Sequence, residues 1–327
     1  MKTIAQCSIP ALILALATPA LAAPVEIKIA TVAPNGSSWM KIFNKMKKKV
    51  KKETAGEVKI KFYAGQVQGD EKDVVRKMRT GQLQGGSFTA VGLGKLNPKV
   101  LVLQMPMLFD TEKELDKVRK AMRTEFEKSF INKGYVLLGW GDVGWVYIFS
   151  KKPIDSQPSL RKQKVWVWKD DPISKKMMKI AGVSPQLLGL PGVYPALNTG
   201  MVNAVYNAPL ACLTLQWYTK VKYYTDYKLA IAIGATVINK ATWDKISAAN
   251  QKKVMAITWK YHRALTLKIR RDNKKALKAL IKAGIKPVPV TAANKKKFRD
   301  IALKVADKFA GKYYTRALLN KVIKLKK

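Results

Sequence analysis

The chain has 327 residues, of which 62 are Lys or Arg and 21 are Asp or Glu, so its formal net charge is +41. At about 150 residues per domain, this length predicts roughly two domains. A hydrophobic content of 48% excludes an intrinsically disordered chain, despite the charge. The basic excess excludes an acidic, metal-buffering protein and leaves nucleic acid, anionic surfaces and anionic small molecules as partner classes.

The first 22 residues differ in kind from the rest. Lys2 is their only charge, residues 9–22 are nearly all apolar, and Ala20-Leu21-Ala22 has the small-residue pattern of a cleavage site. This predicts residues 1–22 to be a secretory signal peptide, leaving an exported chain of charge +40, since Lys2 is lost. Cys212 is then the only cysteine, so no intrachain disulfide can form.

Strand-like and helix-like patterns alternate after the signal segment, which predicts layers of α/β structure. Alternating apolar residues or apolar runs predict strands at 58–62, 135–140, 145–149, 164–168 and 229–238. Helical spacing predicts a helix that follows Ser37-Ser38, another after the capping sequence at Thr111, and a third over 210–223. The longest pattern runs from Ser247 to Ile281, and a helix of that length would span about 50 Å and reach across two domains.

Catalytic motifs are scarce. His262 is the only histidine, so any nucleophile–base pair would have to use it, and a structural histidine is the better interpretation. One histidine and one mature cysteine exclude a Cys/His zinc site. Residues 139–144 match G-x-G-x-x-G, but a strand-like run follows instead of the helix that a dinucleotide site needs. We therefore expect no enzyme, no metal site and no cofactor.

Aromatic residues in the middle of the chain are more informative. Strand alternation over residues 164–168 places Trp166 and Trp168 on one face and the two valines between them on the other. Tyr206 and Asn207 end another short strand, where α/β proteins place ligand contacts. Core packing and an aromatic wall on a ligand cleft both fit this pattern.

Lysine is concentrated on the outward stripes of the predicted helices, most densely over residues 47–52. A solvated basic surface explains this, as does a patch for nucleic acid or membrane. Nucleic acid is disfavoured, because the basic residues are spread over the whole chain and only 10 of the 62 are Arg.

Several segments together resemble the substrate-binding proteins of tripartite ATP-independent periplasmic (TRAP) transporters, of the dicarboxylate-binding type. The resemblance covers essentially the whole mature chain and rests on the order of its segments. These segments are residues 29–37, 63–71, 105–109, 151–154, 159–168, 182–185, 194–204 and 238–247.

The resemblance implies a two-lobed periplasmic binding protein fold with hinge strands, a ligand cleft and a long helix crossing both lobes. It places residues 23–144 and about 232–270 in lobe I, and residues 145–231 and about 271–327 in lobe II. It also implies a periplasmic, non-catalytic monomer that delivers a small-molecule ligand to integral-membrane TRAP transporter subunits and binds no nucleic acid.

The departures from the family pattern concern the ligand. Trp166 stands where the resemblance expects an arginine that clamps a carboxylate, and a second arginine is missing near Trp145. Val193 replaces an acidic residue, whereas the downstream Asn207 is retained. Replacement of polar groups by Trp and Val favours an apolar or aromatic ligand held by stacking and a few hydrogen bonds. A carboxylate held differently, with Lys169 as a point charge, is the alternative.

The first hypothesis is thus a periplasmic receptor that closes around its solute. Its predicted ligand-binding residues are Trp166, Trp168, Asn207, Tyr206, Trp145, Phe88, Trp39 and Trp217. The rival hypothesis is an exported basic protein that binds an anionic polymer or a membrane surface.

Overall fold

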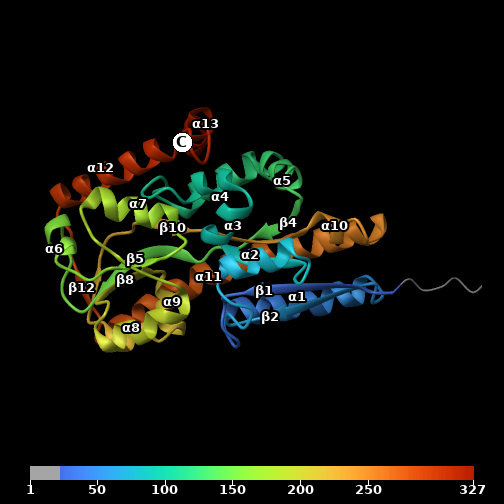
Figure 1. The fold of residues 1–327 in the computed structure, drawn as a ribbon, viewed down its shortest axis with the longest axis horizontal. Coiled ribbons are helices and arrows are strands. Elements are labelled where there is room, and N and C mark those ends of the chain that lie inside the picture. Colours follow the sequence, from blue (N-terminus) through green and yellow to red (C-terminus); the bar gives the residue numbers. More distant parts are fainter. Residues whose placement is uncertain (1–22) are drawn as a thin grey trace, which may run out of the picture.

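The computed structural model describes residues 23–327, so the predicted signal peptide lies outside the described residues. Two α/β lobes lie side by side along the long axis of the molecule (Figure 1). The two-lobed fold expected from the sequence is confirmed.

The first lobe is built on a five-stranded sheet in which β1 pairs in parallel with β2 and β3, and β11 runs antiparallel between β3 and β4. In β2, Val58 and Ile60 are buried while Lys59 and Lys61 are exposed, which is the predicted half-buried pattern. In spatial order the strands are β2 (Val58–Tyr63), β1 (Val25–Thr31), β3 (Gly85–Thr89), β11 (Gly234–Asn239) and β4 (Tyr135–Trp140).

The second lobe has a smaller sheet centred on β5, and a separate two-stranded parallel ladder carries the tryptophans. The sheet contains β10 (Ala230–Ala232), β5 (Gly144–Ser150), β9 (Tyr223–Thr225) and β12 (Lys286–Val288), with β8 (Ala204–Asn207) paired to β5. The ladder joins β6 (Trp166–Trp168) to β7 (Gln186–Leu188).

Helices cover both sheets. Those of the first lobe are α1 (Ser38–Glu53), α2 (Glu71–Arg79), α3 (Ala90–Leu96), the 3-10 helix η1 (Pro98–Gln104), α4 (Glu112–Ala121), α5 (Arg123–Ile131) and α10 (Lys240–Trp243). Those of the second are α6 (Gln157–Arg161), α7 (Pro172–Ala181), η2 (Leu190–Gly192), α8 (Val193–Thr199), α9 (Pro209–Thr214), η3 (Trp217–Lys220) and α12 (Ala292–Phe309), while α13 (Arg316–Lys326) ends the chain.

Two extended segments cross between the lobes beside each other. One leads from β4 to β5 and the other from β10 to β11, and they are joined where Gly141 N donates to Gly234 O (2.8 Å) and Val143 N donates to Ala232 O (2.9 Å). A Cβ atom at Gly234 would lie 2.4 Å from the Gly141 carbonyl oxygen. Glycine at position 234 therefore permits the close backbone approach that pairs the two crossings.

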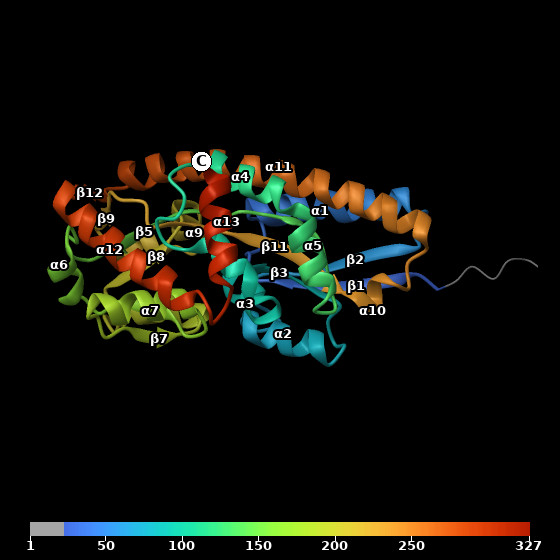
Figure 2. The same ribbon diagram turned by 90° about the horizontal axis from the view of Figure 1, so that it is seen from above.

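The third connection is α11 (Ala248–Lys282), a single helix of 35 residues that runs along both lobes (Figure 2). Its buried stripe includes Val254, His262 and Ile269. The long crossing helix predicted from the sequence is confirmed, and it packs against α1 of the first lobe.

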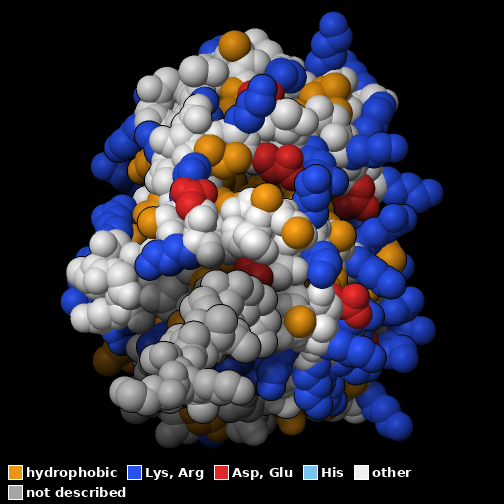
Figure 3. Space-filling view, turned by 90° about the vertical axis from the view of Figure 1, so that its right-hand side faces the viewer, with side chains coloured by type: hydrophobic (Ala, Val, Ile, Leu, Met, Phe, Trp, Pro, Cys, Tyr) orange, Lys and Arg blue, Asp and Glu red, His pale blue; other side chains and the backbone are white. Residues whose placement is uncertain are grey.

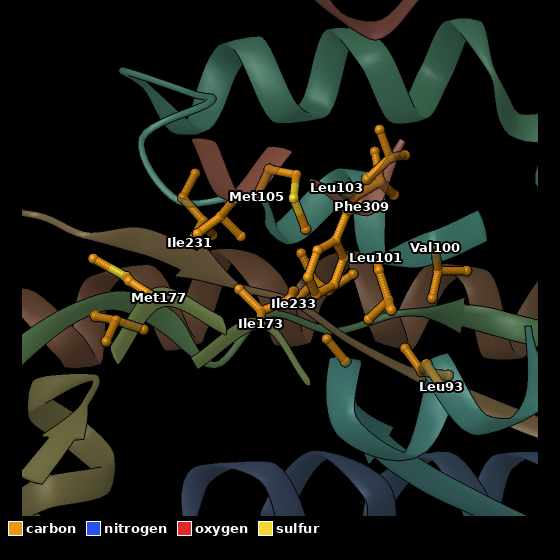
Figure 4. Packing of buried hydrophobic residues seen from close by; sticks show 14 of the residues in the cluster. Leu93, Val100, Leu101, Leu103, Met105, Ile173, Met177, Ile231, Ile233 and Phe309 are labelled. Carbon is orange, nitrogen blue, oxygen red and sulfur yellow. The ribbon is translucent and has the colours of Figure 1, made fainter. Parts of the chain in front are cut away.

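The largest apolar cluster is shared between the lobes. Leu93 and Leu101 enter it from the first lobe, Ile173 and Met177 from α7 of the second, and Ile231 from the crossing strand β10 (Figure 4). Burial across this boundary stabilises the arrangement in which the lobes face each other.

Two expectations need correction. The strand expected over 229–238 is interrupted between β10 and β11, because it passes from one sheet to the other there. The helix expected over 210–223 ends at Thr214, and Gln216 takes a left-handed conformation with φ of 58° before η3 begins. The last helix, α13, packs on α4 and η1.

Candidate functional site

A cavity of about 170 Å³ lies between the lobes. The first lobe contributes Phe88 at the end of β3 and Trp39 on α1, and the second contributes Trp168 on β6 and Asn207 at the end of β8. The crossing segments and the inner face of α11 complete its walls. Ligands in α/β proteins commonly bind at such strand ends.

One wall is an aromatic stack from the second lobe. The rings of Trp166 and Tyr206 are stacked, with centroids 5.0 Å apart, and Trp168 lies beside Trp166 at 6.4 Å. Val165 and Val167 belong to a different apolar cluster from the two tryptophans, as strand alternation predicts. Strand β6 thus packs into the core through its valine face and forms the cavity wall through its tryptophan face.

Two of the predicted aromatic residues do not line this cavity. Trp217 is 1% exposed and packs edge-on against Trp166 at 5.3 Å, so it supports the wall from behind. Trp145 lines a separate hollow, with Lys228 over its ring, whereas Val146 lines the main cavity. The other six predicted residues, Trp166, Trp168, Asn207, Tyr206, Phe88 and Trp39, all line it.

Asp171 is the one carboxylate among the described lining residues, and its hydrogen bonds are already made. It caps α7 by accepting from Ile173 N (2.9 Å) and Ser174 N (3.1 Å), and it also accepts from Ser174 Oγ (2.6 Å) and Tyr206 Oη (2.9 Å). Burial, followed by the Asp171 charge, raises the pKa of Tyr206 well above 10. With four donors bound, Asp171 serves the fold rather than a ligand cation.

His262 also reaches the cavity, as a neutral and structurally committed side chain. Its Nδ1 donates to the Thr258 carbonyl (2.8 Å), which leaves Nε2 to accept from the Thr236 hydroxyl (2.7 Å). Burial lowers the pKa of His262 to about 4. The histidine therefore carries no charge into the site at neutral pH.

Two carboxamides supply polar groups that are not committed within residues 23–327. Gln104 Oε1 accepts from Ile233 N (2.9 Å), and Asn207 Oδ1 accepts from Ala208 N (2.9 Å). Their NH₂ groups have no hydrogen-bond partner among the described residues, and both side chains line the cavity and are half-buried. Each can donate to a carbonyl or hydroxyl oxygen of a ligand. Sequence patterns did not identify Gln104, which is the last residue of the 3-10 helix η1.

No Lys or Arg is found among the described residues that line the cavity. Lys169, the point charge that the sequence suggested, is exposed and is not part of the lining. Among residues 23–327 there is also no cluster of three or more His, Cys, Asp or Glu side chains arranged to hold a metal ion.

A buried ionic network holds the crossing segment beside the cavity. Asp142, which is fully buried, binds Arg119 of α4 (2.6 Å) and Arg270 of α11 (2.8 Å), and Arg270 makes a bidentate pair with Asp116. The Asp142 carbonyl accepts from Trp39 Nε1 (3.3 Å). Although burial opposes its charge, the two guanidinium groups lower the pKa of Asp142. The network thus connects the crossing segment between β4 and β5 to Trp39 of the cavity wall.

A two-lobed architecture with a cavity between the lobes is the arrangement that the sequence resemblance implied. The family described as bacterial extracellular solute-binding protein, family 7, matches residues 29–312. The chain belongs to this family. The resemblance to TRAP receptors is therefore confirmed, and the family consists of receptors that bind solutes.

Relatives of this family 7 receptor are known. The C4-dicarboxylate-binding periplasmic protein of Rhodobacter capsulatus is 25% identical over 312 residues, which cover 92% of this chain and 91% of that protein. A TRAP periplasmic solute-binding protein from Pseudomonas putida, with bound D-glucuronate, is 26% identical with a TM-score of 0.81, covering 91% of this chain and 96% of that one. Another TRAP periplasmic solute-binding protein, from Desulfovibrio salexigens with bound orotic acid, is 22% identical with a TM-score of 0.84. The match covers 92% of this chain and 97% of that one.

None of the helices in residues 23–327 combines the length and the hydropathy needed to cross a membrane.

Proposed function

We propose that this receptor binds an uncharged, largely apolar or aromatic organic solute in the periplasm and delivers it, as a monomer, to the membrane subunits of a TRAP transporter. The observation that carries the ligand class is the lack of Lys and Arg among the described residues that line the cavity. A carboxylate taken from water into such a site would lack a counter-charge, and an unpaired buried charge is strongly unfavourable.

The size of the cavity supports a small solute. Its volume is about 170 Å³, and an apolar cavity of about 150 Å³ is large enough to hold benzene. Aromatic and aliphatic side chains from both lobes form most of its walls, including Phe88, Trp168 and Ile173. A molecule built on about one ring therefore fits the space and the chemistry of these walls.

The carboxamides determine which polar group such a solute should carry. Gln104 and Asn207 each present an uncommitted NH₂ donor, so the complementary group is an acceptor such as a ketone, an amide or an ether. Donors of this kind fix the orientation of a ligand whose affinity comes mainly from apolar contact.

A carboxylate held by neutral donors is the second candidate. It is favoured by the comparisons, because the similar structures from Pseudomonas putida and Desulfovibrio salexigens hold D-glucuronate and orotic acid. In this chain the same two carboxamides would have to bind the carboxylate without help from an arginine.

Matched pairs of ligands distinguish the two candidates. A panel of single-ring carboxylic acids, including orotic acid, is screened beside the corresponding primary amides by thermal shift and calorimetry. We expect the amides to raise the melting temperature more than their acids do. We also expect Asn207→Ala to weaken the bound amides by at least tenfold, while Asn44→Ala, an exposed asparagine on α1, leaves them unchanged. Tighter binding of the acids would support the second candidate.

A further inference from the structure

Many of the basic residues of the described chain lie on two helices that pack against each other. Helix α1 carries seven lysines and one glutamate, and α11 carries eleven basic residues and one aspartate. The helices are joined by a hydrogen bond from Ser38 Oγ to Asp272 Oδ2 (2.6 Å). Their outward sides together form one surface, which we call the α1/α11 face.

Most of these cations are uncompensated. Lys49 pairs with Glu53, Lys268 with Asp272, and Arg270 with Asp116 and Asp142. The other fifteen basic residues of the two helices form no ion pair with any described residue, and all of them except Lys47 are exposed. In an end-on view, Lys and Arg side chains crowd along one edge of the molecule with few acidic groups among them (Figure 3).

The ligand cavity does not explain this charge. The inner sides of the same two helices, through Trp39, Phe43, His262 and Leu265, line the cavity. The lysines therefore occupy the opposite sides of these helices and cannot contact a bound solute. A surface whose charges face outward is suited to an extended partner rather than to the small ligand.

The chemistry of the face favours a lipid surface over nucleic acid. Thirteen of the fifteen unpaired residues are Lys and two are Arg, and Lys acts as a point charge on a flexible stem rather than as a bidentate reader of bases. Leu267 and Ile281 are 49% and 43% exposed among these cations, so the face also offers apolar side chains for shallow contact with lipid.

We propose that the α1/α11 face binds the anionic phospholipid headgroups of the membrane in which the transporter lies. The choice of membrane rests on the proposed receptor function, whereas the binding itself requires no solute. Negative lipid surfaces attract clustered Lys and Arg. The attraction decays over about 8 Å at physiological ionic strength, so the contact would be reversible and sensitive to salt.

Two variants that change the net charge equally provide the test. One carries Lys41→Gln, Lys48→Gln, Lys274→Gln and Lys278→Gln on the α1/α11 face. The control carries four changes at exposed, unpaired lysines of α12 and α13, namely Lys297→Gln, Lys304→Gln, Lys308→Gln and Lys324→Gln. Co-sedimentation is measured with vesicles of pure phosphatidylcholine and with vesicles that contain roughly 30% phosphatidylglycerol in phosphatidylcholine.

We expect the wild-type protein to bind the phosphatidylglycerol vesicles and not the neutral ones. The α1/α11 variant should lose at least tenfold in affinity, whereas the control should stay within about threefold. Equal losses in the two variants would overturn the proposal, because overall charge rather than this face would then be responsible. Equal binding to neutral vesicles, or tighter binding to duplex DNA than to the anionic vesicles at the same salt, would also overturn it.

This outcome is separable from that of the proposed function. The vesicles contain no solute, so loss of lipid binding leaves the ligand assignment intact. Conversely, a carboxylate ligand in the cavity would leave the lipid contact intact. Unchanged thermal unfolding of both variants confirms that the comparison is between folded proteins.

Discussion

Trp168 of the second lobe donates a hydrogen bond through Nε1 to Oδ2 of Asp70 in the first lobe, at 2.9 Å. The same carboxylate oxygen accepts from Leu190 N (3.3 Å), and a Cβ atom at Gly189 would lie only 2.9 Å from it. Trp168 and Leu190 both line the cavity. A carboxylate from one lobe thus holds two wall residues of the other. A second contact lies nearby, where Lys95 of α3 pairs with Asp170, which follows β6 (3.0 Å).

This contact predicts that Trp168 controls how far the lobes close. Trp168→Phe keeps an aromatic ring but removes the donor to Asp70, a bond to a charged group worth about 1.5–3 kcal/mol. The closed arrangement should lose population, and small-angle scattering should show a larger radius of gyration for the ligand-free protein.

Trp166→Phe is the matched control for this variant. Trp166 Nε1 donates to Leu188 O (3.1 Å), a bond that remains within the second lobe. The control should scatter like the wild type. A radius of gyration that is the same in both variants and in the wild type would show that the Asp70 contact does not govern closure.

The buried network at Asp142 predicts a large loss of stability when its carboxylate is neutralised. Asp142→Asn leaves Arg119 buried without a counter-charge, whereas Arg270 keeps Asp116. The free energy of unfolding in urea should fall by about 3–5 kcal/mol. Asp300→Asn removes only the exposed pair with Lys296 and should cost less than about 1 kcal/mol. Similar small losses in both variants would contradict the role given to the network.

Burial of His262 predicts a specific dependence of stability on pH. The pKa is about 4 in the folded protein and 6.5 when unperturbed, so the unfolded chain takes up the proton first as the pH falls. The contribution of this group is complete above pH 6.5 and is lost between pH 6.5 and 4, by about 3 kcal/mol. His262→Gln should lack this part of the slope in urea titrations between pH 7.5 and 4. Parallel pH profiles for the two proteins would show that the ring is not buried as described.

Trp166 is predicted to affect folding as well as binding. It is 1% exposed and packs against Tyr206 and Trp217, so Trp166→Ala leaves a cavity and should lower the free energy of unfolding by about 3–5 kcal/mol. Trp39→Ala, at a half-buried wall position, should cost less. Equal stabilities of wild type and Trp166→Ala, measured in urea, would show that Trp166 is not part of the packed wall.

Much of the fold could be predicted because it depends on local periodicity. Helical spacing marked α11 almost to its ends, and period-two alternation separated the two tryptophans of β6 from the valines beside them. Breaks within continuous apolar patterns could not be predicted. The strand change at Ile233 depends on where the chain passes from one sheet to the other, not on residue type. The left-handed Gln216 lies between α9 and η3, and no Gly or Asn marks that turn in the sequence.

Residues that line the cavity could be predicted where residue type and strand position agreed, and were missed where the tertiary arrangement decides. Trp145 was chosen for its ring, but Val146, its neighbour on the alternating strand β5, lines the cavity. The contact that Asp70 makes between the lobes could not be predicted, because its partners, Trp168 and Leu190, are about a hundred residues away in the sequence. Gln104 ends the mostly apolar 3-10 helix η1, and no motif surrounds it.

The most direct test of the central claim is the identity of the small molecule that co-purifies with the protein. The molecule is released by denaturation and analysed by mass spectrometry, with exact mass and fragmentation used to detect a carboxyl group. The account predicts an uncharged molecule of about one ring that carries a carbonyl, amide or ether oxygen. A carboxylate released in stoichiometric amount would contradict it, because the cavity would then hold an anion without an Arg or Lys among its described lining residues.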